Sequence, residues 1–173
     1  LYPMRSLAFL PLAALMLCAT SAAAQPVSFG EGWREQRFSL FSSNRFSFGA
    51  GGLGVRSDKA VSLVWKPLPE SLQAKRRAQW RWEVARSVGP TDLARKGGDD
   101  RNLALYFLFL PERPAGAPNV RALLNNPDIR VLMYVWGGAH ARGQVLPSPY
   151  LGARGRTLVL RAAGTGAYDE QVN

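Results

Sequence analysis

The chain has 173 residues, with 22 basic and 12 acidic side chains and a formal net charge of +10. This length suits a single domain with a hydrophobic core of its own. The basic residues are scattered singly, which argues against a nucleic-acid partner and leaves two alternatives: an anionic envelope polymer or lipid head groups, or a soluble surface without a specific anion site.

The first segment has the pattern of a secretory signal peptide. Residues 4–24 place a start methionine and one arginine before an apolar run, which ends in three alanines. This run is shorter than the about 20 residues that span a bilayer, so a signal peptide is favoured over a membrane anchor. We also expect no transmembrane segment in the mature chain. We therefore predict that 1–24, with 1–3 upstream of the start, are removed by cleavage before Gln25, and that the product is periplasmic or secreted. The single cysteine, Cys18, lies in this leader, so no disulfide is expected.

Strand patterns dominate residues 25–173. Apolar and polar side chains alternate with period two, as in half-buried strands, in six segments: 37–41, 45–49, 53–57, 60–66, 78–84 and 156–162. Two further segments, 102–110 and 129–136, are apolar on both faces, as central strands are. Helical patterns are short, at 71–78 and 120–126. The sequence therefore predicts an all-β domain, a β-sandwich or jelly roll.

Only a short tail follows the last predicted strand. A sheet that ended there would leave strands without neighbours and would expose their backbone edges. We therefore expect residues 25–173 to form one domain that is incomplete at its C-terminus.

Two adjacent aspartates, Asp99 and Asp100, follow two glycines and precede the apolar segment 102–110. Carboxylates at this position could bind Ca²⁺, which takes about six to eight oxygen ligands, or could accept hydrogen bonds from sugar hydroxyls. The structural alternative is a turn, because glycine allows a positive φ and aspartate side chains bond nearby backbone amides. No spaced acidic series typical of a calcium loop follows. The turn-forming role is therefore favoured, and no cofactor is predicted.

Aromatic and polar side chains share faces on the two central segments, 102–110 and 129–136. If these strands are neighbours, their mixed faces merge into a platform on which sugar rings stack, while polar groups bind the hydroxyls. The alternative is that each ring fills the core. The candidate ligand-binding residues are Asp99, Asp100, Asn102, Tyr106, Arg130, Tyr134 and Trp136.

The sequence offers little support for catalysis. It contains no nucleophile elbow, phosphate loop or dinucleotide fingerprint. A glycosidase needs two carboxylates at a set separation, and Glu83 with Asp99 or Asp100 is the pairing that the sequence suggests. His140 is alone in a glycine-rich loop, where we expect it to face solvent. A binding protein is therefore favoured over an enzyme.

Five segments taken in order resemble a known family. They are WRWEV (80–84), KGGDD (96–100), ALYFLF (104–109), LMYVWG (132–137) and SPYLG (148–152). This ordered set is similar to a bacterial family of exported proteins, domain of unknown function 3047. The resemblance implies a fold and a compartment outside the cytoplasm, and it implies no reaction. A sandwich similar to carbohydrate-binding modules agrees with it at the level of fold analogy alone.

Three functional hypotheses follow from the sequence. The first is an exported non-enzymatic β-sandwich that binds a glycan or another envelope polymer. The second is a carbohydrate-active hydrolase that uses paired carboxylates. The third is an envelope scaffold or assembly partner whose exposed sheet pairs with another chain.

Overall fold

The structure is a computed structural model that describes residues 25–112, 114, 116 and 119–173. The predicted signal peptide lies outside the described residues. Of the described residues, 41% are in strands and 7% in helices, so the prediction of a mainly β protein is confirmed. No helix among the described residues is long and apolar enough to cross a membrane.

The described residues contain ten strands and two short helices. In chain order they are β1 (Arg34–Arg37), β2 (Arg45–Gly49), β3 (Gly52–Arg56), β4 (Ser62–Trp65), α1 (Glu70–Gln73), β5 (Ala78–Val84), β6 (Leu103–Phe109), α2 (Val120–Asn125), β7 (Arg130–Trp136), β8 (Val145–Ser148), β9 (Gly152–Arg161) and β10 (Gly166–Val172).

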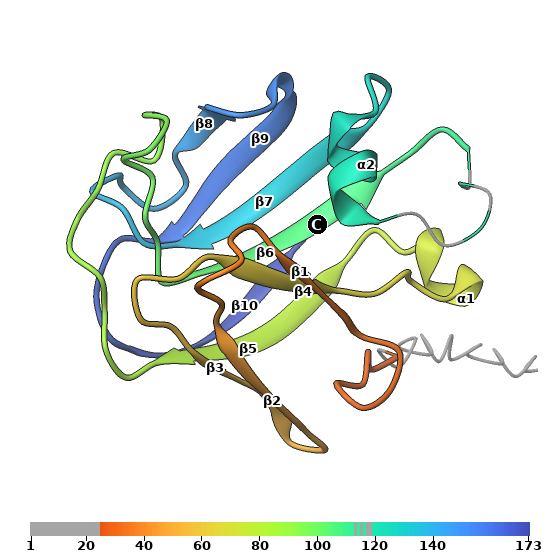
Figure 1. Ribbon diagram of the computed structural model, residues 1–173, viewed down its shortest axis with the longest axis horizontal. Helices are drawn as coiled ribbons and strands as arrows, with labels where there is room; N and C mark the ends of the chain where they lie inside the picture. Colours follow the sequence, from red (N-terminus) through yellow and green to blue (C-terminus); the bar gives the residue numbers. More distant parts are fainter. Residues whose placement is uncertain (1–24, 113, 115, 117–118) are drawn as a thin grey trace, which may run out of the picture.

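One four-stranded sheet and three two-stranded sheets make up the fold. The larger sheet has the order β6-β7-β9-β8, and β7 runs antiparallel to β6 but parallel to β9 (Figure 1). The smaller sheets pair β1 with β4, β2 with β3, and β5 with β10. Several small sheets are thus present, and they identify neither a sandwich nor a jelly roll.

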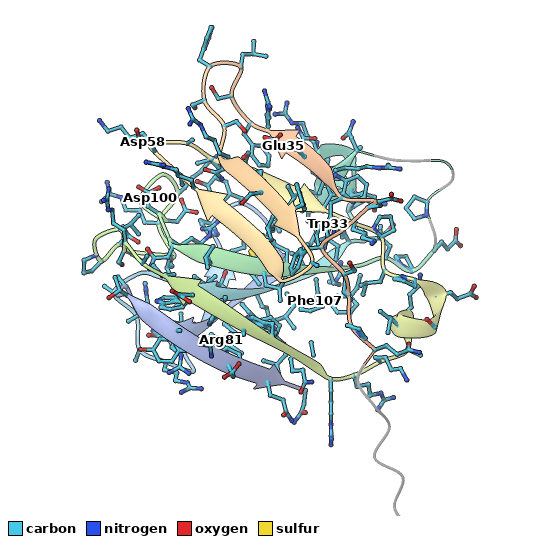
Figure 2. All side chains as sticks on the ribbon, turned by 90° about the horizontal axis from the view of Figure 1, so that it is seen from below. Trp33, Glu35, Asp58, Arg81, Asp100 and Phe107 are labelled. Atoms are coloured by element: carbon cyan, nitrogen blue, oxygen red, sulfur yellow. The ribbon has the colours of Figure 1, made fainter. Side chains whose placement is uncertain are left out.

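The four-stranded sheet buries a hydrophobic core on each face, because side chains on alternate positions of β7 point in opposite directions. The helix-side core contains Leu93, Leu123, Ile129, Val131, Met133, Val135, Leu146 and Val159. The ribbon core contains Trp82, Val84, Tyr134, Trp136 and Leu160. Leu123 of α2 and Trp65 of β4 pack in the first, and β5 and β10 cover the second. Figure 2 shows the N-terminal strands above and the β5–β10 pair below.

A buried carboxylate lies within the layer that covers the ribbon core. Glu170 of β10 is 5% exposed. It accepts hydrogen bonds from Arg161 Nε at 2.7 Å and from Trp82 Nε1 at 3.3 Å. The Arg161 guanidinium also lies 4.0 Å from the ring centre of Tyr168. These contacts compensate for the removal of the charge from water.

Three sequence predictions about strands are wrong in detail. Residues 38–41, predicted as part of a strand, form a loop after β1. Residues 137–149, where no strand was predicted, contain β8, whose edge position tolerates Pro147, a residue with no amide hydrogen to donate. The tail after residue 162 contains β10, which pairs antiparallel with β5 along its whole length.

Candidate functional site

The predicted aromatic platform does not form, although its two strands are neighbours as expected. In the β6–β7 register Leu105 lies opposite Tyr134, and Tyr106 lies opposite Met133. Directly opposed residues of an antiparallel pair point to the same side of the sheet. Tyr106 therefore points to the helix-side core, while Tyr134 and Trp136 point to the ribbon core.

The rings of Tyr134 and Trp136 fill the core instead of lining a surface. Their residues are 4% and 1% exposed. Tyr134 packs 5.5 Å from Trp80, and Trp136 packs 5.6 Å from Trp82 and 5.1 Å from Tyr168, measured between ring centroids. Burial raises the pKa of the Tyr134 hydroxyl. The core-filling alternative is thus the correct one for both residues.

Asn102 and Arg130 are occupied by contacts within the protein. The Asn102 side-chain amide donates to Ser87 Oγ at 3.1 Å and to the Gly164 carbonyl at 3.2 Å, and its oxygen accepts from the Val88 amide at 2.7 Å. Asn102 therefore joins three loop segments. The exposed Arg130 donates to the carbonyl of the preceding residue at 2.9 Å.

Asp99 and Tyr106 do meet, and Arg101 connects them. Arg101 donates through Nη1 to Asp99 Oδ2 at 2.8 Å and through Nη2 to the Tyr106 hydroxyl at 2.7 Å. The Asp99 and Arg101 side chains are 11% and 28% exposed. The pair is thus partly withdrawn from water, where charge-assisted hydrogen bonds are strong.

Tyr150 completes this network and brings it to the surface. Its hydroxyl donates to Asp99 Oδ1 at 2.9 Å and accepts from the Gly97 amide at 3.2 Å. Although its hydroxyl is held, Tyr150 is 54% exposed. The Lys96 ammonium lies 5.6 Å from the centre of its ring. We call Lys96, Asp99, Arg101, Tyr106 and Tyr150 the Tyr150 cluster.

Local turns and close glycine contacts position the cluster. The Asp92 carboxylate accepts from the Ala94 amide at 3.0 Å, so Asp92 has the turn-forming role that was predicted for Asp99 and Asp100. Gly97 adopts a φ of 75°, which glycine tolerates without strain. A Cβ atom on Gly137 would lie 2.7 Å from the Arg101 Cα atom. The chain after β7 therefore approaches Arg101 as closely as only glycine allows.

The electrostatics of the cluster favour an ionised Asp99. Burial opposes ionisation, but hydrogen bonds from Arg101 and Tyr150 outweigh it and hold the pKa of the Asp99 carboxyl below its usual value. For Tyr150, the hydrogen bond from the Gly97 amide lowers the pKa of the hydroxyl, but burial and the Asp99 carboxylate together raise it. Tyr150 is therefore a neutral donor to an anionic Asp99.

The carboxylates predicted for a hydrolase do not share a cleft. Glu83 is exposed and alternates with the core residues Trp82 and Val84, so it points away from the ribbon core. The Asp99 side chain belongs to a network with Tyr106, on the helix-side face of the sheet. Asp100 is exposed, and its carbonyl accepts from the Thr91 hydroxyl. The paired-carboxylate mechanism therefore has no support in the geometry.

His140 is less exposed than the sequence predicted. Its side chain is 16% exposed, and Nε2 lies 3.5 Å from Asp92 Oδ1. The expectation of a solvent-facing histidine is therefore wrong. Within the described part of the chain, no group of three or more His, Cys, Asp or Glu side chains is arranged to hold a metal ion. At Asp99, the adjacent guanidinium of Arg101 would repel a cation.

The sequence reasoning missed Tyr150 and Arg101 as site residues. The sequence did offer a hint, because Tyr150 lies in SPYLG and its partner Asp99 lies in KGGDD, two of the segments that carried the family resemblance, and Arg101 directly follows KGGDD. The 51-residue separation of Asp99 and Tyr150 hid their contact. Nothing in strand periodicity indicates which loops meet.

A family model described as Protein of unknown function (DUF3047) matches residues 31–171, which is well over half of the chain. No curated protein and no solved structure matches it.

Proposed function

This chain belongs to the DUF3047 family of proteins of unknown function, and we propose that it is an exported, non-enzymatic protein that binds a glycan or another envelope polymer through the Tyr150 cluster. The single observation that carries the proposal is an exposed aromatic ring whose hydroxyl is fixed from below by Asp99 and Gly97.

A fixed and exposed ring is suited to stacking on a sugar. Most exposed side chains lose rotational freedom when a ligand orders them, which weakens binding. The two hydrogen bonds of Tyr150 already restrict its ring in the free protein. An aromatic face then offers a large apolar contact at a small further loss of entropy.

The charges around the ring favour a ligand rich in hydroxyl groups over a polyanion. Within residues 92–101 three basic side chains are balanced by three acidic ones, namely Arg95, Lys96 and Arg101 against Asp92, Asp99 and Asp100. Sugar hydroxyls both donate and accept hydrogen bonds, so they match a surface that carries cations and carboxylates together. A strongly anionic polymer would find no net positive charge in this segment.

The proposal retains two predictions that were made from the sequence. One is export, for which the support is the leader pattern at residues 4–24. The other is a β-sandwich resembling carbohydrate-binding modules. Its support is the packing of the β5–β10 pair against one face of the four-stranded sheet, which stacks two β layers around the ribbon core.

An array of immobilised envelope glycans tests the proposal. We expect the protein to bind at least one glycan, and Tyr150→Ala to weaken that binding by at least about tenfold through the loss of the stacked area. Tyr150→Phe keeps the ring but loses both hydrogen bonds of the hydroxyl, so an intermediate affinity is expected.

Phe109→Ala is the matched control. Phe109 is 55% exposed, almost the same as Tyr150, but it lies at the end of β6, outside the Tyr150 cluster. We expect this variant to bind as the wild type does. Failure of the wild type to bind any glycan, or equal losses in Tyr150→Ala and Phe109→Ala, would refute the proposal.

A further inference from the structure

A second surface, on the N-terminal strands, carries apolar side chains that the fold does not bury. The loop between β1 and β2, residues 38–44, presents Leu40 at 94% and Phe41 at 97% exposure. Phe38 of the same loop is 43% exposed. Fully exposed large apolar side chains at adjacent positions are unfavourable in water, so a partner is expected to cover them.

The base of this loop is fixed, so its tip is held outward. The Asn44 amide donates to Ser62 Oγ at 3.0 Å, and the Asn44 side chain donates to the Ser62 carbonyl at 3.1 Å. The Ser43 hydroxyl donates to the Glu35 carboxylate. Figure 2 shows the chain after Glu35 standing out from the body of the molecule at the top of the view. The tip is therefore a convex protrusion on an anchored base.

The β2–β3 hairpin next to the loop adds apolar area. Phe46 lies opposite Val55 and Phe48 lies opposite Leu53, so these four side chains share one face. Phe48 and Val55 are 45% and 41% exposed. A hollow of about 420 Å³ is lined by Phe46 and Phe48 together with Arg37, Arg45 and others of the N-terminal segment.

The N-terminal segment is also basic, with Arg45 and Arg56 on the face of the hairpin opposite its four apolar side chains. Residues 26–66 carry six basic and three acidic side chains. Arg45 and Arg56 lie directly opposite each other in the hairpin, an arrangement that is destabilising because like charges repel. The six ion pairs of the described residues include neither of them. An anionic partner would remove this repulsion.

We propose that the 38–44 loop and the β2–β3 hairpin dock the protein on an anionic lipid bilayer, with Leu40 and Phe41 inserted among the acyl chains and Arg45 and Arg56 at the head groups. A convex apolar tip needs a pocket in a protein partner, whereas a fluid bilayer accommodates it without one. Apolar insertion combined with basic residues at the interface is the usual basis of peripheral membrane binding. This surface is separate from the Tyr150 cluster, so either proposal can fail alone.

Co-sedimentation of the purified protein with phosphatidylglycerol–phosphatidylcholine vesicles tests the proposal. We expect binding that weakens as salt is raised. The Leu40→Ser/Phe41→Ser variant should lower the partition coefficient by at least about tenfold, because two large apolar side chains no longer leave water. The Arg45→Gln/Arg56→Gln variant should lower it by about tenfold at low salt.

Two double variants serve as matched controls. Phe109→Ser/Val145→Ser removes two other exposed apolar side chains, and Arg86→Gln/Arg121→Gln removes two other exposed arginines. Both should bind vesicles as the wild type does. The proposal is overturned if the protein binds no vesicles, or if it binds pure phosphatidylcholine vesicles as strongly as anionic ones. It is also overturned if the loop variant and its control variant bind vesicles equally. Light scattering that shows a dimer lost in Leu40→Ser/Phe41→Ser, without vesicle binding, would instead identify a second copy of the chain as the partner.

Discussion

At the scale of single residues, Asp99 makes the stability of the protein depend on pH. Its folded-state pKa lies below the ordinary value of 3.8. A depressed pKa contributes stability that is present above the unfolded-state value and is lost as the pH falls through the folded-state value. We therefore expect Asp99→Asn to reduce the free energy of unfolding by about 1–3 kcal/mol at pH 7, because hydrogen bonds from Arg101 and Tyr150 lose a charged acceptor.

Urea unfolding of both proteins over a range of pH measures this effect. The difference in unfolding free energy between wild type and Asp99→Asn should be constant near neutral pH and should narrow as the pH falls below the ordinary value of 3.8, which holds in the unfolded state. Asp100→Asn is the control, since Asp100 is an adjacent but exposed aspartate. A gap for Asp99→Asn that is independent of pH would contradict the assignment.

Two neighbouring acids on β10 allow a direct comparison of buried and exposed ion pairs. Glu170→Gln leaves the Arg161 guanidinium without its carboxylate in the layer over the ribbon core, and we expect a loss of about 3 kcal/mol in urea unfolding. Asp169 pairs with Arg81 at 3.2 Å, but both side chains are mostly exposed. Asp169→Asn should therefore cost less than about 1 kcal/mol. Equal losses in the two variants would show that burial does not decide the strength of these pairs.

At the scale of elements, the turn after β7 couples the sheet to the Tyr150 cluster. Gly137 has a φ of 149°, and its added Cβ would meet Arg101 backbone and side-chain atoms at 2.7 Å. We expect Gly137→Ala to reduce the free energy of unfolding by at least about 2 kcal/mol through overpacking. The amide of Asn102, which donates to the Trp136 carbonyl at 3.0 Å, should then exchange with deuterium faster.

Gly143→Ala separates the clash from backbone strain. Gly143 has a φ of 84° with no atom within 4 Å of an added Cβ, so its substitution introduces strain alone, at about 1 kcal/mol. The exchange of the Asn102 amide should be unchanged in this variant. If Gly137→Ala reduced the free energy of unfolding by no more than Gly143→Ala does, the clash would be relieved by a free movement of Arg101.

Strands whose sequence alternates regularly or is apolar throughout could be predicted from the sequence. Strands that depart from both patterns could not. The segments that became β5, β6 and β7 carry long runs of strand-forming residues, and each was predicted. β10 was missed because Glu170 occupies one of its core-facing positions, where a pattern of hydrophobicity requires an apolar residue. β8 was missed because Pro147 and nearby glycines resemble a loop.

At the scale of the whole molecule, the candidate site depends on which strands and loops are neighbours and in which register they pair. The alternation of side chains along the sequence does not give this information. The predicted adjacency of segments 102–110 and 129–136 is confirmed by the β6–β7 pair. The register is a separate property, and a shift of one residue exchanges the faces of a strand. The observed register places Tyr106 and Trp136 on opposite faces. Asp99 and Tyr106 belong to the same cluster because Arg101 donates hydrogen bonds to both, which connects the loop to the strand β6.

The two cores should unfold together because β7 contributes to both. Val135 is 1% exposed in the helix-side core, while its neighbours Tyr134 and Trp136 lie in the ribbon core. Val135→Ala should reduce the free energy of unfolding by about 2 kcal/mol through the cavity it leaves. Tryptophan fluorescence reports mainly on the ribbon core, since three of the five tryptophans lie in or against it.

The urea midpoint of Val135→Ala can be measured both by tryptophan fluorescence and by far-UV circular dichroism. If the sheet is a single cooperative unit, the substitution lowers both midpoints by the same amount. Val145→Ala, at a side chain that is 52% exposed on the edge strand β8, should shift neither by more than the equivalent of about 0.5 kcal/mol. If the fluorescence midpoint were unchanged while the circular dichroism midpoint fell, the ribbon core would remain folded after the helix-side core had unfolded. Because alternate side chains of one strand, β7, pack into both cores, the loss of one core should remove the support for the other.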